Sequence, residues 1–445
     1  MKTSRYIMVG IALIATAATL SQAQNIVRVH VDASTSLEQV LGDDWSEIDS
    51  LVVTGQASSD DLKMLRRCIY DGATTGVDLS QCSVPQNTLP DAAFMAEFKP
   101  DETGALQPSQ QLHFMTLPVN LKAINEYAFA YSGIRSISFP ASLVTVGERA
   151  FYRCRSLRGD LNLPNSVNTV GEDAFRNSWH ITSAHLPGDA TVGSWTFSHV
   201  PLLRSVYIPD GCKVGRGCFW WATSLTDVQM EDDVSLGGYA FAFCGALEQV
   251  RLPRLLPEIA DGVFYQCGLQ QIEWPDVQRV RESNSTYRID DRAFSGNRFK
   301  TIVVPDGVTT IVSGSFGNNP ELEMVVLPDG LISLSFRAFN NCPNLVAIYS
   351  KAIIPCYMLG ADPGYPLFEQ ATLYIPAGTM ANYKSRNGWK EFKNIVEVDA
   401  FPFSGVDGIT APTADDDVYY DLRGIRVKNP SHGLYIHQGK VVAVP

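Results

Sequence analysis

The sequence is dominated by a phenylalanine that returns at nearly regular intervals along most of its length. Successive occurrences of this key Phe are 22 to 30 residues apart, and most of the spacings are 22 or 23. The positions are Phe129, Phe151, Phe175, Phe197, Phe219, Phe241, Phe264, Phe294, Phe316, Phe339 and Phe368. A period in the twenties is typical of a solenoid, in which each repeat buries its apolar side only by stacking on its neighbours.

Each repeat also contains a strand-like phrase, as in residues 203–208 and 247–252. Its last three residues alternate apolar, variable and apolar, which places the apolar side chains inward and the variable one outward. A proline such as Pro209 or Pro253 usually follows. Because proline has no N–H, it ends the hydrogen-bonded ladder and turns the chain. We therefore expect a repeat solenoid, mostly β with short helical turns, of about a dozen rungs.

The segments on either side of the regular repeats differ from them in pattern. We expect residues 24–117 to form an N-terminal cap with an irregular first rung, 118–376 the solenoid, and 377–398 a C-terminal cap. A terminal unit must differ from the others because its outer side has no neighbour. Within the first cap, the polar stretch 95–110 is expected to be a loop. In the second cap, we expect Trp389 and Phe392 to cover the last rung and Thr379 to cap a short helix over residues 380–386.

The N-terminal residues resemble a secretory signal. Lys2 and Arg5 precede an apolar core over residues 6–20, which is too short to span a membrane comfortably. Small residues at Ser21 and Ala23 predict cleavage after Ala23, so residues 1–23 would be removed on export. The mature chain is not expected to cross a membrane and would be extracellular or at the cell surface.

Charge and motif content exclude several functions. The formal net charge of −12 argues against a nucleic-acid partner, since phosphate binding needs clustered Lys and Arg. The seven histidines form no metal-spaced pair, and neither a GxSxG elbow nor a phosphate-cradling glycine loop occurs. We therefore predict no catalytic residue, metal or cofactor.

Nine cysteines occur in the chain, and the repeat explains four of them. These four sit three residues after a key Phe, in a slot that other repeats fill with Ser or Ala: Cys154, Cys244, Cys267 and Cys342, against Ser132, Ser178 and Ala222. Such a slot is small and buried, so we expect thiols there. Two other pairs, Cys68 with Cys82 and Cys212 with Cys218, stay open as disulfides in an exported protein.

The outward strand position forms one candidate binding column. Stacked rungs would align its residues in a ladder: Ser138, Asn162, His185, Tyr207, Gln229, Arg251, Glu273, Val303, Val326, Tyr349 and Tyr374. A solvated sheet face is the alternative, although the adjacent Val303 and Val326 favour contact with something. A charged insertion at residues 276–289 is either a solvated loop or a binding lip.

A second column lies two residues after the key Phe and contains His199, Trp221 and Phe243, with Trp220 beside it. Trp provides a large contact area with a polar handle, which suits protein hot spots and sugar stacking. Since Phe219 fills the inward slot, we expect at least one of the two indoles to meet solvent. The alternative is that these aromatic residues only pack between turns.

The repeat phrase as a whole is apolar-x-x-Val-x-Leu-Pro, then Val-x-x-Ile, then Ala-Phe-x-x-Cys. Over most of residues 85–376 it resembles the BspA-type leucine-rich repeat of bacterial surface proteins. The resemblance implies a secreted or surface-exposed leucine-rich-repeat rod that binds other molecules, without catalytic residues or a shared ligand site. After a linker at 399–417, the short β tail at 418–445 resembles the C-terminal segment of exported Bacteroidetes proteins. Some such tails are sorting signals, which would associate the chain with the outer membrane.

These observations lead to a hypothesis of a non-enzymatic, adhesion-like binding protein whose partner is a protein or a glycan. The candidate ligand-binding residues are His199, Trp220, Trp221, Phe243, Tyr207 and Arg251. The alternatives are a carbohydrate-active or proteolytic enzyme supported on the solenoid, and a structural spacer. An exposed aromatic patch would favour binding, whereas buried carboxylates in a cleft would favour the enzyme.

Overall fold

The structure is a computed structural model that describes residues 25–256, 258–274, 287–360 and 362–401, together with four short strands between 419 and 444. The expected signal peptide, most of the insertion at 276–289 and most of the linker at 399–417 lie outside the described residues. The chain divides into two compact units, Met1–Ile208 and Pro209–Pro445. Each unit is described by itself.

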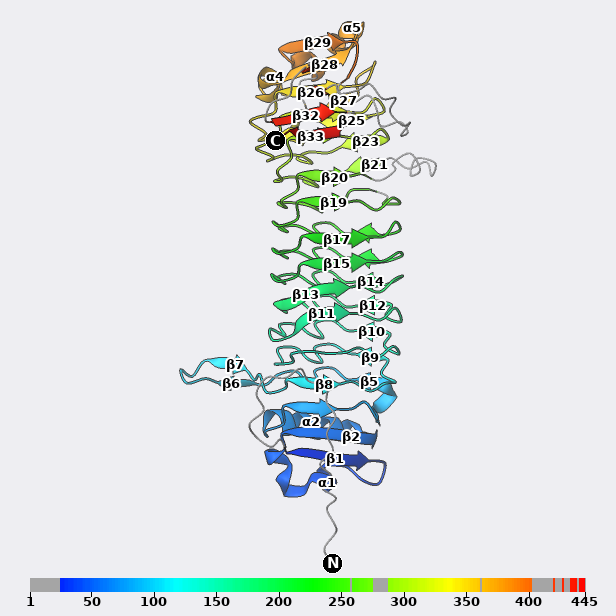
Figure 1. Cartoon of the computed structure of the whole chain (residues 1–445), viewed down its shortest axis with the longest axis vertical. Helices are drawn as coiled ribbons and strands as arrows, with labels where there is room; N and C mark the ends of the chain where they lie inside the picture. The colour runs from blue at the N-terminus through cyan, green and yellow to red at the C-terminus, as the bar shows by residue number, and fades with distance from the viewer. Residues whose placement is uncertain are drawn as a thin grey trace, which may run out of the picture. The chain divides into compact units, whose positions relative to one another are not determined.

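The first unit begins with a cap in which a parallel sheet is covered by helices (Figure 1). Its strands and helices are β1 (Ile26–Val31), α1 (Leu37–Leu41), η1 (Gly42–Glu47), β2 (Ser50–Gln56), α2 (Ser59–Tyr70), β3 (Gly76–Asp78), β4 (Cys82–Ser83) and β8 (Phe114–Thr116). Helix α2 starts at a capping box in which Ser58 and Asp61 bond to each other's backbone N–H. Buried Asp61 also accepts from the backbone N–H of Leu37, at 2.6 Å, so this carboxylate ties α1 to α2.

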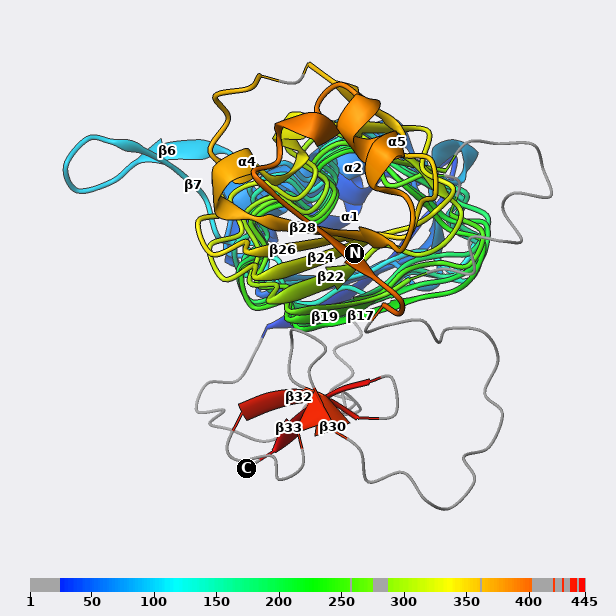
Figure 2. The same cartoon turned by 90° about the horizontal axis from the view of Figure 1, so that it is seen from above.

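The segment 95–110, predicted to be a loop, instead contains an antiparallel hairpin of β6 (Phe98–Pro100) and β7 (Leu106–Pro108). Figure 2 shows it projecting sideways from the first unit. The Asp101 carboxylate closes its turn by accepting from the N–H groups of Thr103 and Ala105. The hairpin was not predicted because its turn contains Asp101, Thr103 and Gly104, and these residue types are also common in loops.

Two parallel ladders build the rungs of the first unit. One joins β5 (Thr88–Leu89), β9 (Ala123–Ile124), β10 (Thr145–Val146), β12 (Thr169–Val170) and β14 (Thr191–Val192). The other joins β11 (Arg158–Asn162), β13 (His180–His185) and β15 (Ser205–Ile208). Most rungs thus contribute one short and one longer strand, although the rung of β9 has only an isolated bridge at Ser136 in place of the longer one. The turn containing the key Phe lies between successive strands.

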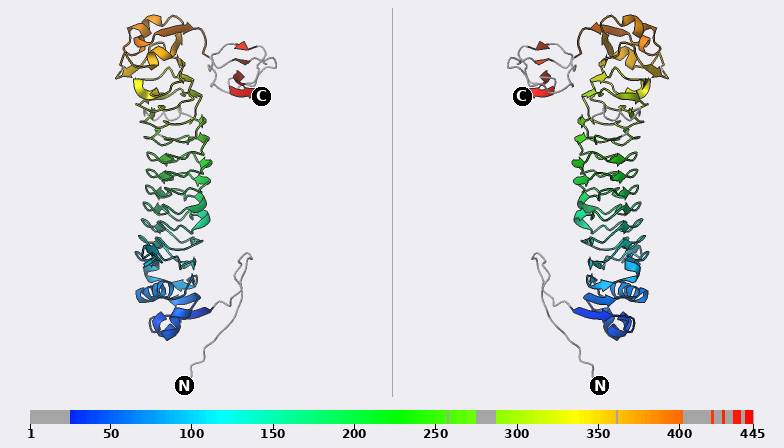
Figure 3. Two further views of the ribbon diagram at one scale, coloured as in Figure 1. Left: turned by 90° about the vertical axis from the view of Figure 1, so that its left-hand side faces the viewer. Right: turned by 90° about the vertical axis from the view of Figure 1, so that its right-hand side faces the viewer.

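The second unit repeats this arrangement and adds a cap. Its strands are β16 (Lys213–Val214), β17 (Asp227–Met230), β18 (Ser235–Leu236), β19 (Gln249–Arg251), β20 (Gln271–Glu273), β21 (Tyr287–Ile289), β22 (Thr301–Val303), β23 (Val308–Ile311), β24 (Met324–Leu327), β25 (Ser333–Ser335), β26 (Ala347–Ser350), β27 (Tyr357–Leu359), β28 (Thr372–Pro376) and β29 (Asn394–Val398). Figure 3 shows the rungs of each unit lying one above another.

The last rungs of the second unit contain the helices η3 (Phe336–Phe339) and α4 (Leu367–Gln370), and the C-terminal cap contains α5 (Met380–Ser385) and η4 (Trp389–Glu391). Trp389 and Phe392 are buried there, as expected, and the Trp389 indole donates to the carbonyl of Cys356. The expected Thr379 cap is wrong. Its hydroxyl donates to the Pro376 carbonyl, and the Glu397 carboxylate accepts from the N–H of Met380 instead.

Beyond the cap, the tail forms β30 (Tyr419–Tyr420), β31 (Arg426–Val427), β32 (Gly433–His437) and β33 (Lys440–Val444). These strands pair antiparallel in the order β31, β30, β32, β33. The described part of the predicted β tail is thus a four-stranded antiparallel sheet.

The key Phe side chains form a stacked column in the core of each unit. In the first unit, ring centroids of consecutive residues from Phe129 to Phe197 are 5.0 to 5.2 Å apart and nearly parallel. In the second, those from Phe219 to Phe339 are 5.1 to 5.8 Å apart. Phe94 extends the first column, with its ring centroid 5.6 Å from that of Phe129. The spacing is that of parallel strands, so each ring rests on the ring of the next rung.

The turn around each key Phe is itself a ladder between rungs. Around Phe241, the N–H groups of Tyr239, Phe241 and Phe243 donate to carbonyls of the next rung at 2.8, 2.9 and 2.8 Å. The intervening N–H groups bond three residues back within the turn. The residues two before and two after the key Phe adopt positive φ, 59° at Tyr239 and 64° at Phe243.

The slot three residues after the key Phe is confirmed as buried, and in seven rungs it also holds a hydrogen-bond donor. Its side chain donates to the carbonyl of the key Phe one rung earlier: Cys154 at 3.0 Å, Ser178 at 2.9 Å, Cys244 at 3.3 Å, Cys267 at 3.0 Å, Asn297 at 2.9 Å, Asn319 at 3.2 Å and Cys342 at 3.3 Å. All nine cysteines are described, buried and thiols, so the pairs Cys68–Cys82 and Cys212–Cys218 form no disulfide.

The buried thiols make stability depend on alkaline pH. Burial raises the pKa of Cys154 to about 12 and that of Cys342 to about 11, against a usual value near 9. Above pH 9 the unfolded chain therefore loses these protons while the folded chain keeps them. Stability is expected to be complete below pH 9 and to fall progressively between pH 9 and 12. Urea unfolding at pH 8 and pH 10.5 measures this, and equal midpoints would contradict it.

The outward strand face of the last rungs is not a solvated ladder. Val326 and Tyr349 are 0% and 2% exposed, and Tyr349 stacks on Tyr374 at 4.5 Å. Val303 and Phe401 pack against the same cluster. Val303 and Val326 therefore contact other side chains of the same chain, and contact with a separate molecule stays a prediction.

Candidate binding edge

The turns of the second unit gather aromatic side chains into one continuous group. We call Trp220, Trp221, Tyr239, Phe243 and Tyr265 the aromatic edge. Phe243 lies at its centre, with ring centroids 4.8 Å from Trp220, 5.7 Å from Trp221 and 5.4 Å from Tyr265. Tyr239 joins Trp220 at 5.7 Å and Tyr265 at 6.2 Å. Three consecutive rungs therefore contribute to one aromatic surface.

Part of this surface faces solvent. The Trp221 side chain is 46% exposed, whereas Phe219, two residues earlier, is fully buried in the core column. Trp220 and Phe243 are half-buried. The expectation that at least one of the two indoles meets solvent is confirmed, and Trp221 is the exposed one.

The backbone under Trp221 and Phe243 does not favour large side chains. Their φ values of 62° and 64° lie in the left-handed region, which disfavours residues with a Cβ, and Asn least among the common ones. The equivalent positions of three other rungs hold Asn177, Asn318 and Asn341 at φ of 54° to 61°, and those of four more hold larger side chains, also at positive φ: Tyr131, Arg153, His199 and Gln266. Local conformation therefore favours Asn but accepts large side chains, and the backbone does not require the aromatic residues at 221 and 243.

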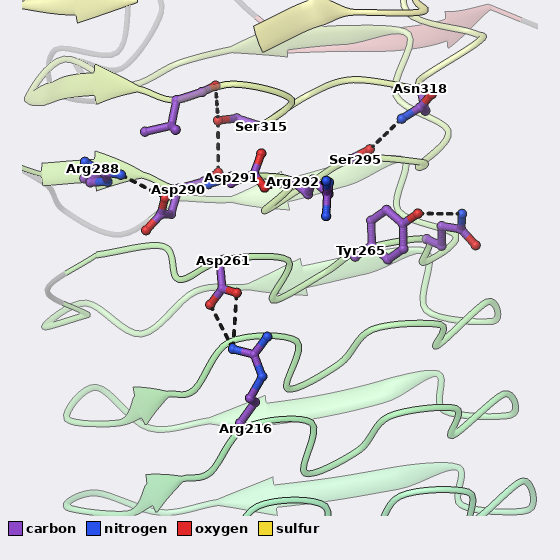
Figure 4. A network of polar contacts seen from close by, with 12 residues as sticks. Arg216, Asp261, Tyr265, Arg288, Asp290, Asp291, Arg292, Ser295, Ser315 and Asn318 are labelled. Carbon is purple, nitrogen blue, oxygen red and sulfur yellow. Dashed lines mark hydrogen bonds and ion pairs between the residues drawn. The ribbon is translucent and has the colours of Figure 1, made fainter. Parts of the chain in front are cut away.

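Charged groups border the aromatic edge. The Arg216 guanidinium lies 4.7 Å from the centre of the Tyr239 ring and forms an ion pair with Asp261 at 3.2 Å (Figure 4). A hydrogen bond with Tyr239, followed by the charge of Asp291, raises the pKa of Arg292. These exposed pairs add little stability. The guanidinium groups of Arg216 and Arg292 thus both lie against Tyr239 at the surface.

Arginine–aromatic pairs also occur on the turns of the first unit. Arg153 lies 5.9 Å and 5.4 Å from the ring centres of Tyr131 and Tyr152, and Arg155 lies 4.1 Å from that of Trp179. The pairing of arginine with aromatic rings is thus a property of the turns in both units.

His199 belongs to the first unit, so it is described apart from the aromatic edge. It has φ of 56°, and its Nδ1 lies 2.8 Å from the Ser198 hydroxyl. Desolvation, aided by Arg176, lowers the pKa of His199 below its usual 6.5, so the ring is neutral at pH 7. Of the predicted strip, the structure brings Trp221 and Phe243 together, with Trp220.

The other two predicted residues lie on strands, not on turns. Tyr207 is on β15 of the first unit, where its ring centroid is 4.5 Å from that of His185. Arg251 is on β19 of the second unit and bonds the Asp232 carboxylate at 3.0 Å and the Met230 carbonyl at 3.1 Å. The Arg251 guanidinium is therefore already bound by a carboxylate and a backbone carbonyl of its own unit.

Sequence analysis missed Tyr239, Tyr265 and Arg216. Tyr239 lies two residues before a key Phe, in a second left-handed column that also holds Tyr127, Arg149 and Trp195. Counting backward as well as forward from each Phe would have found it. Tyr265 directly follows Phe264, as Trp220 follows Phe219.

The described residues offer little for catalysis. Their two fully buried carboxylates, Asp61 and Asp173, both have structural partners, and Asp173 binds Arg149 and Arg176. No group of three or more His, Cys, Asp or Glu side chains within them is arranged to hold a metal ion. In the same residues, no helix is long and apolar enough to cross a membrane.

The family model of the BspA type leucine rich repeat region matches residues 104–226 and 212–346, with six copies. These matches span more than half of the chain. The chain belongs to this family. Membership in the BspA-type repeats confirms the solenoid fold and supports a repeat-based binding or structural role.

Similar solved structures are also leucine-rich-repeat proteins. One from Bacteroides ovatus is 19% identical over 66% of this chain and 68% of its own, with a TM-score of 0.41. The pneumococcal vaccine antigen PcpA is 18% identical over 86% of this chain and 96% of its own, with a TM-score of 0.44. A Treponema pallidum leucine-rich-repeat protein is 22% identical over 45% and 78%, with a TM-score of 0.29. A search of the curated proteins found no match.

Proposed function

We propose that this BspA-type repeat chain is a secreted or cell-surface binding protein, without enzymatic activity, that recognises a partner protein through the aromatic edge. The observation that carries the proposal is Trp221. Its indole is 46% exposed on a left-handed residue, at a position that holds Asn in three other rungs and Tyr, Arg, His or Gln in four more. Both its exposure and its strained backbone work against stability, so a partner is the simplest reason for a Trp at this position.

The composition of the aromatic edge supports a protein partner. Trp, Tyr and Arg are the residue types most enriched in the hot spots of protein interfaces. Here two Trp and two Tyr surround Phe243, with Arg216 against one ring. Their contacts with one another limit side-chain motion before binding, which reduces the entropy lost on association.

The proposal also includes export of the chain from the cytoplasm. A signal peptide at residues 1–23, cleaved after Ala23, would deliver the chain through the membrane. The tail at 418–445 would then associate it with the outer membrane. The engagement of both buried carboxylates in structural bonds favours binding over an enzymatic role.

Replacing Trp221 with Asn is expected to weaken partner binding by about 30-fold, which corresponds to about 2 kcal/mol for a hot-spot residue. The full chain is first screened against a panel of extracellular-matrix proteins, and the variant is then titrated against each protein bound. Leu255→Asn is the matched control, because Leu255 is another exposed apolar residue of the same unit, at 52% exposure. Equal affinity of wild type and Trp221→Asn would remove the aromatic edge from the binding site.

A further inference from the structure

An open groove of about 540 Å³ lies in the second unit, where the chain leaves the turns and enters β17, β19 and β20. Its lining is Thr226, Ala246, Glu248, Gln249, Gln270 and Gln271. The volume is within the range of small-molecule sites. None of the aromatic-edge residues lines it.

Two glycines lie beside the groove. The position four residues after the key Phe varies between rungs: it holds Arg155, Trp179 and Arg298 in three of them, Gly, Pro or Thr in five others, and Gly245 and Gly268 here. Packing explains Gly268, because a Cβ there would come within 2.5 Å of the Gly245 carbonyl oxygen. A Cβ on Gly245 would meet nothing within 4 Å, and its backbone does not have the positive φ that favours glycine. The fold therefore does not require glycine at 245.

A glycine that the fold does not require often marks the close approach of a ligand. Gly245 directly precedes the lining residue Ala246, so it lies beside the groove. An arginine here, as in the rung of Arg155, would extend over the groove. The free space around Gly245 and the groove that begins at Ala246 therefore adjoin each other.

The lining defines the chemistry of the ligand. Gln249 on β19 is in register with Gln271 on β20, so these two amides sit on neighbouring strands, about 4.8 Å apart. The Glu248, Gln249, Gln270 and Gln271 side chains are exposed, and none of them hydrogen-bonds within the described part of the chain. Amides both donate and accept, as sugar hydroxyls do. The six lining residues include one carboxylate and no cation, which disfavours anionic ligands.

We propose that this groove binds a neutral oligosaccharide. Gln249, Gln271 and Glu248 would hydrogen-bond its hydroxyls, and the open space at Gly245 would admit one end of the glycan. This goes beyond the proposed function, since it requires neither Trp221 nor a protein partner.

The test uses the full chain on a printed array of neutral, sialylated and sulfated oligosaccharides. Binding to at least one neutral glycan is expected, and the bound glycan is then titrated by calorimetry. Gly245→Arg is expected to reduce affinity at least tenfold with an unchanged melting temperature, whereas Gly245→Ala should bind like wild type. Gln249→Ala and Gln271→Ala should each weaken binding about fivefold, which keeps the test decisive if Gly245→Arg does not fold.

Trp221→Asn separates this proposal from the previous one, because it should bind the glycan like wild type. Three results would overturn the glycan groove: no neutral glycan bound, a preference for the sulfated or sialylated glycans, or wild-type affinity in Gly245→Arg and both glutamine variants. Loss of glycan binding in Trp221→Asn would likewise show that the groove is not the site.

Discussion

Truncation of Phe241 to alanine is expected to lower the free energy of unfolding by about 3–5 kcal/mol. The Phe241 ring is fully buried between Phe219 and Phe264, at centroid distances of 5.1 and 5.4 Å and interplanar angles of 13° and 5°. Its removal takes an apolar ring from the core and leaves a cavity bounded by two other rings. The stacked neighbours cannot close that cavity, because their backbones are held one rung apart by the turn ladder.

Chemical denaturation of wild type and Phe241→Ala measures this loss. Phe114→Ala is the matched control, because Phe114 is 51% exposed and should lose less than about 1 kcal/mol. A loss below about 1 kcal/mol in Phe241→Ala would contradict the role of the Phe column as the core of the repeats.

Replacement of Asn297 by leucine is expected to cost about 2–6 kcal/mol. Its buried side-chain amide donates to the carbonyls of Phe264 and Phe294, at 2.9 and 3.0 Å, and its oxygen accepts from the N–H of Leu269 at 3.1 Å. Leucine has a similar volume but leaves two buried backbone groups, the Phe264 carbonyl and the Leu269 N–H, without these partners, each at a cost of about 1–3 kcal/mol. The Phe294 carbonyl still accepts from the Asn319 amide.

Asn297→Cys provides a graded comparison. The thiol at Cys267, one rung earlier, donates to the carbonyl of Phe241, so a thiol at 297 should restore one of the three bonds. Its stability is expected to fall between those of wild type and Asn297→Leu. The exposed Asn344, which bonds only the Pro320 carbonyl, supplies the control Asn344→Ala. Equal stability of the leucine and cysteine variants would show that volume, and not donation, defines the slot.

The repeat made the core predictable from sequence because every rung places its apolar residues at the same positions. The key Phe column, the caps and the thiol slot follow from that recurrence. The hydrogen-bond donor in the slot three residues after the key Phe was not visible from the sequence, because Ala222 occupies this slot in one rung. The acceptor is a carbonyl of the preceding rung, so it is known only once the rungs are stacked. The burial of Val326 and Tyr349 was also not visible, because Phe401, which packs on that face, comes from a distant part of the sequence.

The candidate site was predictable only in part. Trp221 and Phe243 stood out because equivalent positions of adjacent rungs stack directly. Sequence spacing did not show that both take left-handed φ, a conformation that this position has in most rungs. The groove was not predicted from the sequence, because a position without a side chain, such as Gly245, gives no sequence signal of a binding site.

The central claim is that the aromatic edge contributes to recognition and not to folding. The most direct measurement is the unfolding free energy of Trp221→Asn, which requires no knowledge of the partner. Asn suits the left-handed backbone at 221, and this gain should offset most of the packing lost with a half-exposed indole. We expect the unfolding free energy of Trp221→Asn to lie within about 1 kcal/mol of the wild-type value. A loss of about 3 kcal/mol or more, typical of a core aromatic residue, would contradict it and assign Trp221 to the fold.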